Sequence, residues 1–305
     1  MRESQLLSAI YEHSADLSGA FEQVQTGPGD DCAVLRTPHG DQLLVSVDQV
    51  IEGVHYSAGR QPPLELIGRK AIARALSDIA AMGGRALGAV TAAALAPEFA
   101  RAEELFEHAR KAAAWFGCPL VGGDIAIRPG PLALTTTVLG VPGAARGPVL
   151  RSEACVGDVV YVTGELGGSF DPETGQGRHL TFDPRLSEGA WLAETLGDAL
   201  GAMIDLSDGL GIDGGRVAAA SEVALEIEAE TIPHSGVGWR RALADGEDYE
   251  LLFTVRPGVD VPRPTPGGTM LTRIGRVIEG RGCFVIAPDG ERIDAAQLGW
   301  NHGQQ

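Results

Sequence analysis

The stretch LSDIAAMGG at residues 76–84 is the most informative part of this sequence for predicting the fold. It closes an apolar-periodic segment that begins after Pro62-Pro63, and the glycine pair at its end is a helix stop signal. We therefore predict a helix over Leu64–Met82. Asp78 interrupts this otherwise apolar pattern, and a carboxylate in such a setting either faces solvent or is held by a partner. Asp78 is thus the first candidate functional residue.

The segments on either side of this helix alternate between strand and helix patterns. β-Branched and alternating residues predict strands at Cys32–Leu35 and Gln42–Val50, after a glycine-rich turn at residues 27–31. Residues 86–95 are apolar, and periodicity alone does not decide between a strand and a buried helix. The other elements expected in this half are a short helix at residues 4–13, a helix at Glu98–Phe116, and strands at Pro119–Val121 and Leu132–Val141 flanking a Gly122-Gly123-Asp124 turn.

A Pro- and Gly-rich stretch at Pro142–Pro148 is the best linker candidate in a chain whose 305 residues suggest two domains. We expect an N-terminal domain at residues 1–147 and a C-terminal domain at residues 148–305. The C-terminal domain is expected to hold a long loop at Gly164–Pro184, helices at about 185–197 and at 209–221, and strands at Asp158–Thr163, Ala202–Asp205, Val223–Glu228, Tyr249–Val255, Ile274–Ile278 and Cys283–Ala287. Strands and helices mix without strict β-α-β alternation, which predicts an α+β fold.

The amino-acid composition limits the kinds of molecule that this protein is expected to bind. Forty-one acidic against 24 basic residues give a net charge of −17, which disfavours binding to nucleic acid or to an anionic membrane. Small phosphorylated ligands stay compatible with this charge, because bound divalent metals reverse the local sign. The longest apolar stretch, Ala86–Pro97, is too short to span a bilayer, and no charged-then-apolar leader opens the chain. The four cysteines are scattered without a zinc spacing, so we expect a cytoplasmic protein with reduced thiols.

Several aspartates lie beside Gly or Ser, or within apolar segments, where an acidic side chain calls for an explanation. They are Asp30, Asp31, Asp48, Asp78, Asp124, Asp205 and Asp208. Each alone fits a turn or a helix cap. If they converge, two carboxylates about 4 Å apart repel one another by roughly 4 kcal/mol at an effective dielectric of 20. Such a cluster needs cations, oxygen-only ligands favour Mg²⁺, and Mg²⁺ shared with phosphate oxygens is typical of phosphoryl transfer.

The chain lacks the common nucleotide and hydrolase motifs. Its two lysines, Lys70 and Lys111, do not stand in a Walker A pattern. No GxGxxG opens a helix after a strand, and no GxSxG elbow occurs. These absences argue against a P-loop enzyme, a Rossmann dinucleotide site and a serine hydrolase.

A series of short motifs runs in order over nearly the whole chain. In the first half they are Gly29-Asp30-Asp31, Ala33-Val34-Leu35, Ser46-Val47-Asp48, Glu52-Gly53-Val54-His55-Tyr56, residues 76–83 and Gly122-Gly123-Asp124. In the second half they are Arg151-Ser152, Gly157-Asp158, residues 161–164, residues 205–210 and residues 246–253. Each motif is weak alone, but together, in this order and spacing, they make the chain similar to the thiamine-monophosphate kinase family.

The resemblance implies a fold and a reaction. The fold is the two-domain α+β fold shared with aminoimidazole-ribonucleotide synthetase, in which the N-terminal domains of two subunits pair into an intersubunit β-barrel and bind ATP and Mg²⁺. The C-terminal α/β domain completes the nucleotide and substrate site. The reaction is transfer of the γ-phosphoryl group of ATP to thiamine monophosphate, which gives thiamine diphosphate and ADP. Several Mg²⁺ ions, ATP as co-substrate and a homodimer are implied with it.

The resemblance also implies roles for individual residues. The metal ligands would be Asp30, Ser46, Asp48, Asp78, Asp124, Asp205 and Asp208, and the ATP contacts would be Gly123, Asp124, Arg151 and Ser207. The contacts to thiamine monophosphate would be His55, Glu247 and Trp300. Plainer interpretations exist for three of them: Arg151 as a surface residue, His55 as a half-buried histidine, and Trp300 as an aromatic that covers a core edge.

The expected mechanism is direct in-line transfer without a covalent intermediate. The acceptor is itself a phosphate that is mostly ionised at neutral pH, so no strong general base is required. Catalysis would then consist of positioning and of charge neutralisation by Mg²⁺. We therefore expect no nucleophilic residue.

Alternatives with the same fold remain open at this point. A selenophosphate synthetase would carry a reactive Cys or selenocysteine in an N-terminal loop, and none precedes Cys32. A hydrogenase-maturation carbamoyl dehydratase would end in Cys, whereas this sequence ends in Gln305. Two further alternatives are aminoimidazole-ribonucleotide synthetase itself and a non-catalytic ATP-binding module. The module explains the carboxylates poorly, because they need a metal.

Overall fold

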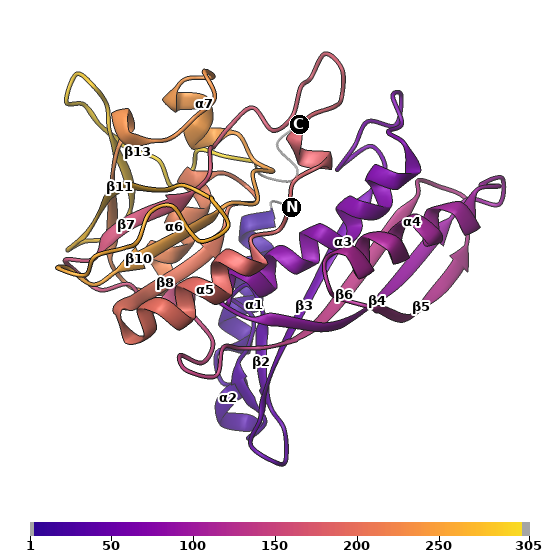
Figure 1. Cartoon of the computed structure of the whole chain (residues 1–305), viewed down its shortest axis with the longest axis horizontal. Helices are drawn as coiled ribbons and strands as arrows, with labels where there is room; N and C mark the ends of the chain where they lie inside the picture. Colours follow the sequence, from indigo (N-terminus) through magenta and orange to yellow (C-terminus); the bar gives the residue numbers. More distant parts are fainter. Residues whose placement is uncertain (1–2, 301–305) are drawn as a thin grey trace.

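The computed structural model describes residues 3–300 and contains two β-sheets with helices packed against them (Figure 1). The strand order is β1-β2-β3-β6-β4-β5 in the first sheet and β13-β12-β9-β11-β7-β10-β8 in the second. All strands of the first sheet end by residue 141, and all strands of the second begin at residue 159 or later. The architecture is therefore a mixed α+β fold, as predicted. The domain boundary after residue 147 stays a prediction.

The first sheet is mainly antiparallel and is covered on one face by α3 and α4, which lie side by side (Figure 1). Its last strand, β5, runs parallel to β4. The elements of this half are α1 (Glu3–Ser14), α2 (Leu17–Ala20), β1 (Val24–Thr26), β2 (Ala33–Arg36), β3 (Gln42–Ile51), α3 (Leu64–Ala81), β4 (Arg85–Leu95), α4 (Ala102–Trp115), β5 (Leu120–Ile127) and β6 (Ala133–Val141).

The central helix α3 starts directly after Pro63 and ends before Gly83, whose φ of 63° suits a glycine. It packs tightly against α4, because a Cβ built at Gly68 would lie 2.8 Å from the backbone nitrogen of Ala109. Its apolar face contributes Ile72, Leu76 and Ile79 to the core beneath the first sheet. Burial of each such side chain stabilises the fold by about 1.5–3 kcal/mol.

In the first half of the chain, the structure decides one open choice of secondary structure and corrects two predictions. Residues 85–95 form a strand, β4, which settles the open choice. The predicted turn at Gly122-Gly123-Asp124 is wrong, because these residues lie inside β5. Gly123 is needed there for close strand approach and not for a turn: a Cβ at this position would lie 2.0 Å from the carbonyl oxygen of Thr91. Helix α4 begins at Ala102 and not at residue 98, which leaves residues 98–101 outside the helix.

The second sheet packs against α5, α6 and α7. Its elements are β7 (Val159–Thr163), α5 (Leu186–Leu196), β8 (Leu200–Asp205), α6 (Leu210–Ala220), β9 (Ala224–Glu228), α7 (Trp239–Ala244), β10 (Leu251–Val255), β11 (Leu271–Ile278), β12 (Gly282–Ile286) and β13 (Arg292–Asp294). Short 3-10 helices lie at η1 (Arg151–Glu153), η2 (Arg178–Leu180), η3 (Gly197–Ala199) and η4 (Ala229–Thr231). Helix α7, strand β13 and the 3-10 turns were not predicted.

The C-terminal end of α3 joins the two halves of the molecule. Ala80 and Ala81 pack in one cluster with Leu192 of α5 and Met203 of β8. The approach to α5 is close, because a Cβ at Gly189 would lie 2.1 Å from the carbonyl oxygen of Ala80. Helix α3 is therefore buried between the two sheets, and polar groups on it face a low-dielectric interior.

Two observations bear on the expected environment of the protein. Within residues 3–300, no helix is both long enough and apolar enough to cross a membrane. The four cysteines form no disulfide, and Cys155 is exposed whereas Cys32, Cys118 and Cys283 are buried.

Candidate active site

Three carboxylates meet where the two halves of the molecule join. One oxygen from each of Asp31, Asp78 and Asp205 lies within 4.8 Å of the others. Asp31 precedes β2, Asp78 lies on α3 and Asp205 ends β8, so that the loop and helix of the first half face a strand of the second. Oxygen-only ligands in this arrangement suit a hard divalent cation.

The protonation of this cluster reflects its burial. Burial raises the pKa of Asp78 well above its ordinary value, and the nearby Asp205, Asp48 and Asp31 raise it further. The pKa of Asp205 is raised in the same way, first by burial and then by Asp31. Two hydroxyls partly oppose this, since Ser46 Oγ donates to Asp78 Oδ2 at 2.6 Å and Ser77 Oγ donates to Asp205 Oδ2 at 2.6 Å. Ionised together, the three carboxylates need a cation.

Asp30 and Arg151 lie beside this cluster. Burial, together with the charge of Asp31, raises the pKa of Asp30 to about 7, although Arg151 opposes the shift. The Arg151 backbone N–H donates to Asp30 Oδ2 at 3.1 Å, and its guanidinium pairs with Asp31 Oδ1 at 2.7 Å. Arg151 is thus a mostly buried partner of the aspartates, with 13% of its side chain exposed, and not a surface residue.

The other predicted metal ligands are held by different partners. Asp48 on β3 pairs with Arg74 of α3 at 2.8 Å, and Asp208 pairs with Arg216 of α6 at 2.7 Å. Asp48 lies near the cluster in space, because its charge raises the pKa of Asp78. Asp208 is near the cluster in the sequence, three residues after Asp205. Their role as metal ligands stays a prediction.

The structure does not bring Asp124 to this cluster. Asp124 pairs with Ala92 of β4, and both residues are exposed. Residues paired across neighbouring strands project from the same face of a sheet. Asp124 therefore projects from the face opposite α3, whereas Asp48 faces α3. Gly123 lies beside it on the same edge strand, so the predicted ATP and metal contacts of this pair remain untested.

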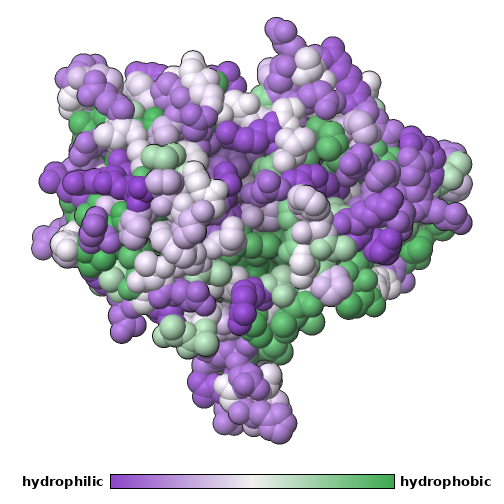
Figure 2. All heavy atoms as spheres, in the orientation of Figure 1, coloured by the Kyte–Doolittle hydropathy of each residue, from purple (hydrophilic) through white to green (hydrophobic). Residues whose placement is uncertain are grey.

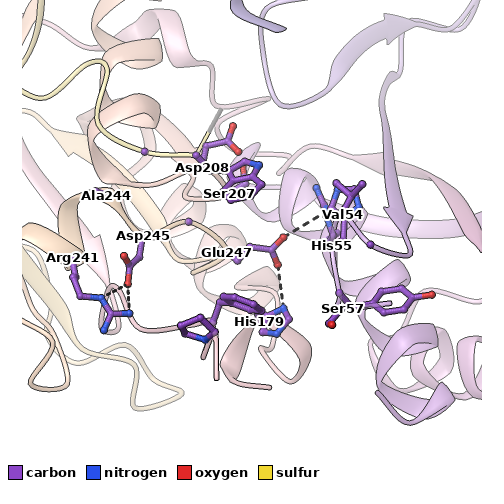
Figure 3. A pocket seen from close by; sticks show the side chains of 18 residues that line it. Val54, His55, Ser57, His179, Ser207, Asp208, Arg241, Ala244, Asp245 and Glu247 are labelled. Atoms are coloured by element: carbon purple, nitrogen blue, oxygen red, sulfur yellow. Dashed lines mark hydrogen bonds and ion pairs between the residues drawn. The ribbon is translucent and has the colours of Figure 1, made fainter. Parts of the chain in front are cut away.

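A cavity of about 570 Å³ opens between the two halves of the molecule (Figure 3). All three residues predicted to contact thiamine monophosphate line it, and so do Ser207 and Asp208. The Trp300 backbone N–H donates to the carbonyl oxygen of Asp208 at 2.8 Å, which fixes the end of the described chain at the cavity. The full lining is Gly53, Val54, His55, Tyr56, Ser57, Arg74, Phe170, Pro172, His179, Ser207, Asp208, Arg241, Ala244, Asp245, Gly246, Glu247, Gly299 and Trp300.

Glu247 is the central acidic group of this cavity and lies between His55 and His179 (Figure 3). Its backbone has a φ of 66°, a conformation that L-residues rarely adopt. Burial alone would raise the pKa of its carboxyl, but Lys70, His179 and Arg74 outweigh burial and hold that pKa below its ordinary value. Glu247 is therefore ionised at neutral pH.

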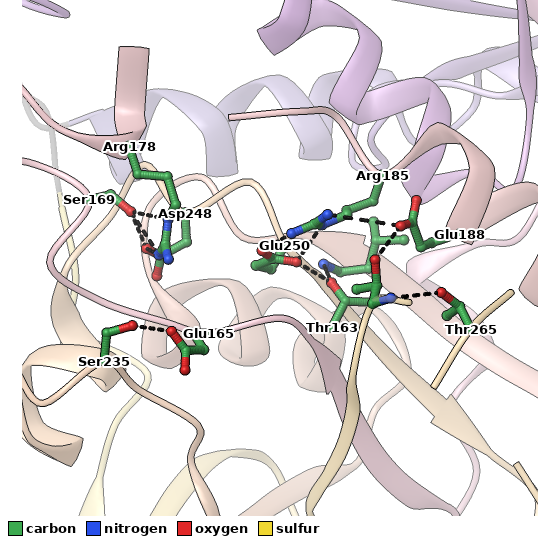
Figure 4. A network of polar contacts seen from close by, with 12 residues as sticks. Thr163, Glu165, Ser169, Arg178, Arg185, Glu188, Ser235, Asp248, Glu250 and Thr265 are labelled. Carbon is green, nitrogen blue, oxygen red and sulfur yellow. Dashed lines mark hydrogen bonds and ion pairs between the residues drawn. The ribbon is translucent and has the colours of Figure 1, made fainter. Parts of the chain in front are cut away.

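The residues that follow Glu247 anchor the long loop between β7 and α5 (Figure 4). Asp248 accepts hydrogen bonds from the Gly167 backbone at 2.8 Å and from Arg178 at 2.7 Å. Glu250 accepts from Arg185 at 2.7 Å and from Thr163 at 2.5 Å. Burial raises the pKa of Asp248 to about 6. The motif at residues 246–250 thus places one carboxylate in the cavity and uses the next two to fix the wall beside it.

Several site residues were missed by the sequence analysis. Asp31 was noted among the aspartates, but Asp30 was preferred as the metal ligand. Lys70 and Arg74 stand in the same apolar helix pattern as Asp78, and the same argument about a charge in an apolar helix identifies them. His179 and Phe170 lie in the long loop, where no pattern in the sequence points to the cavity.

The chain is similar in sequence to known proteins over most of its length. Residues 29–142 match the family model described as AIR synthase related protein, N-terminal domain. The chain is 36% identical to the thiamine-monophosphate kinase of Rhodopirellula baltica over 303 residues, which covers 92% of each chain. It is 33% identical to the thiamine-monophosphate kinase of Escherichia coli K12 over 313 residues, again 92% of each chain.

A solved structure matches this chain over nearly its whole length. It is described as AaThiL complexed with AMPPCP and TMP, and it superposes with a TM-score of 0.80 at 28% identity. The match covers 99% of this chain and 97% of that one. The similarity therefore extends over both sheets and over the site between them.

Proposed function

The chain belongs to the thiamine-monophosphate kinase family, and from this premise we propose which of its residues bind each reactant. The reaction is the ATP-dependent phosphorylation of thiamine monophosphate to thiamine diphosphate. The observation that carries the residue assignment is the cavity, because it gathers His55, Glu247 and Trp300 from distant parts of the chain.

Thiamine monophosphate occupies this cavity in our proposal. Its thiazolium ring is cationic, and the ionised Glu247 supplies the opposite charge in a partly enclosed space. Trp300 provides an aromatic face on which a cationic or heteroaromatic ring stacks favourably. His55 lies on the wall contributed by the first half.

Mg²⁺ ions fit the carboxylate cluster. Asp31, Asp78 and Asp205 supply closely spaced oxygens whose joint ionisation needs a cation. Asp30, Ser46, Asp48 and Asp208 are the further ligands that we propose, because each contacts, acts on or closely follows a residue of this cluster. Asp124 stays a predicted ligand that projects from the opposite face of the first sheet. Bound Mg²⁺ supplies neutralisation of charge on phosphate oxygens.

ATP lies next to these carboxylates in our proposal, with Arg151, Ser207, Gly123 and Asp124 as its contacts. Arg151 presents a planar fork that suits phosphate oxygens, and in this structure Asp31 occupies that fork. Ser207 connects the two sites, because it lines the cavity and stands two residues after Asp205.

The residues of this chain act by positioning and not by covalent chemistry. No nucleophile is needed, because the acceptor phosphate is already ionised at neutral pH. The wall residues orient the acceptor, and Arg151 holds the donor. Transfer is therefore direct and in line.

A homodimer fits the uncovered face of the first sheet. Val47 and Val90 both pair with Thr137, so they project from the same face, and they are 62% and 41% exposed. Figure 2 shows hydrophobic side chains below α3 and α4, where Figure 1 draws β3, β6 and β4. A second copy placed on this face forms the intersubunit barrel that we propose. Light scattering on Val47→Asp/Val90→Asp protein is expected to give the monomer mass.

The direct test of the assignment measures ADP release. We expect release that requires Mg²⁺ and thiamine monophosphate together, with no comparable release on the acceptors of the synthetases that share the fold. Glu247→Gln is expected to raise the KM for thiamine monophosphate with little change in the KM for ATP. Equal activity on an unrelated phosphate acceptor contradicts the assignment.

A further inference from the structure

One buried lysine connects three walls of the cavity without lining it. Lys70 on α3 has no solvent-exposed side-chain surface, and its ammonium donates to the carbonyl oxygen of His55 at 2.8 Å. It also contacts His179 Nδ1 at 2.9 Å and pairs with Glu247 Oε2. An ammonium has three donors, and here each has one acceptor.

The three partners come from segments that are otherwise independent. His55 follows β3, His179 lies in η2 of the long loop, and Glu247 precedes β10. All three line the cavity. Lys70 therefore holds together one wall from the first half of the chain and two from the second.

The contact with His179 sets its tautomer. An ammonium donates and never accepts, so His179 Nδ1 must be the acceptor. A neutral His179 consequently carries its proton on Nε2, and this atom is buried without a hydrogen-bond partner in the described structure. The His179 ring is held edge-on to Phe170, another lining residue, with ring centroids 5.2 Å apart.

The contact with Glu247 balances the charge of its carboxylate. The left-handed conformation of Glu247 persists only where surrounding contacts hold it. Arg74 lies 3.9 Å from the other carboxylate oxygen, which is beyond hydrogen-bond distance. Lys70 is thus a direct hydrogen-bond donor to this carboxylate and is closer to it than Arg74 or His179.

We propose that Lys70 is a positioning residue for thiamine monophosphate: it sets the spacing of His55, His179 and Glu247 around the cationic half of that substrate. This proposal rests on the proposed function of the cavity. It assigns Lys70 to the acceptor side of the reaction and not to ATP, because none of its three partners belongs to the carboxylate cluster.

Steady-state kinetics test this assignment, and the other lysine of the chain provides a matched control. Lys111 lies on α4 with its side chain 65% exposed. In Lys70→Met we expect the KM for thiamine monophosphate to rise by about 10²-fold, the size of effect that misplaced binding groups produce. The KM for ATP should change little, and Lys111→Met should resemble the wild type. An equal rise in both KM values, or no rise, overturns the proposal.

A double-mutant cycle separates positioning from a general loss of stability. Lys70→Met leaves the Glu247 carboxylate buried without its partner, and the variant Lys70→Met/Glu247→Gln removes that charge as well. We expect the double variant to recover thermal stability but not affinity for thiamine monophosphate. If Lys70 acts through Glu247, the two changes in KM are less than additive. Additive changes contradict an action through Glu247.

Lysine side-chain NMR gives a readout that does not depend on turnover. With ¹⁵N-lysine labelling, Lys111→Met protein has a single remaining side-chain ammonium, that of Lys70. We expect a signal protected from exchange that shifts on addition of thiamine monophosphate and not on addition of a non-hydrolysable ATP analogue. An unprotected or unresponsive signal overturns the role of Lys70. Absence of ADP release in the wild type would instead refute the proposed function, so the two failures are distinguishable.

Discussion

Helices α3 and α4 lie side by side on the same face of the first sheet, yet their charged residues are used in opposite ways. On α3, Lys70 and Arg74 find partners on other segments, and Asp78 joins a three-carboxylate cluster. On α4, Arg110 and Lys111 both pair with Glu107, which lies three and four residues before them on the same helix.

The difference follows from what covers each helix. The second half of the chain packs on α3 through α5 and β8, so its charges lie in a low-dielectric interior where each needs a partner. Nothing in the described residues covers the outer side of α4, where Arg110 and Glu107 are 59% and 44% exposed. The buried charges of α3 are therefore the candidates for function, whereas exposed charges such as those of α4 contribute little beyond a solvated surface.

The largest effect is expected from Asp78→Asn. Loss of this carboxylate removes the central ligand of the proposed Mg²⁺ site, so kcat should fall by about 10²–10³-fold or more. The metal-free protein should be at least as stable as the wild type, because repulsion within the cluster falls. Turnover assays and thermal unfolding check both parts. The matched change on α4, Glu107→Gln, should alter neither, and an active Asp78→Asn enzyme would refute the proposed Mg²⁺ site.

A smaller effect is expected from Arg74→Met. This change leaves Asp48 without its ion-pair partner in a largely buried position. Removal of one partner from a buried pair typically costs about 3–5 kcal/mol, and the partial exposure of Asp48 places the expected loss near 3 kcal/mol. Urea unfolding measures it. A midpoint equal to that of the wild type would show that the α3 charges are not coupled to the sheet.

The third prediction concerns pH. Burial raises the pKa of Asp30 from 3.8 to about 7, and it raises the pKa values of Asp78 and Asp205 well above their ordinary value. An acid whose pKa is raised by folding leaves stability intact below its ordinary pKa and lowers stability as pH rises toward the raised value. Without Mg²⁺, the Tm should therefore fall by a few degrees between pH 5 and pH 8.

Added Mg²⁺ should remove most of this fall, because it offsets the charge that ionisation creates. Unfolding scans with Mg²⁺ and with a chelator give the comparison. Asp78→Asn should reduce the slope, which separates the cluster from the overall negative charge of the chain. A Tm that stays level or rises without Mg²⁺ contradicts the prediction.

The smallest effect is expected from Arg110→Met on α4. Its ion pair with Glu107 is exposed and local, so solvent screens it. The urea midpoint and kcat should match those of the wild type. A clear decrease in the urea midpoint or in kcat would contradict the contrast between α3 and α4. It would show that an exposed charge on α4 contributes to stability or activity.

Much of the secondary structure could be predicted, and the reasons are local. The apolar period between Pro63 and Gly83 indicates α3 directly, and β-branched alternation indicates β3. The prediction of a turn at Gly122–Asp124 was wrong, because a Gly-Gly pair occurs both in turns and where two strands approach closely. Only the position of Thr91 in the folded chain decides between these two possibilities. The predicted substrate residues came together in one cavity, whereas Asp124 did not join the aspartates.

By itself the sequence determined that α3 is an apolar helix that carries charges, and such a helix must find partners for them. It did not determine which partners. Lys70 is separated from its acceptors by 15, 109 and 177 residues, and Ser77 from Asp205 by 128. Helical periodicity fixes the face from which a side chain projects, but the group that meets it there depends on how distant segments pack. Only the tertiary structure therefore decided that Asp31 joins Asp78 and Asp205, and that one buried ammonium holds the walls of the cavity.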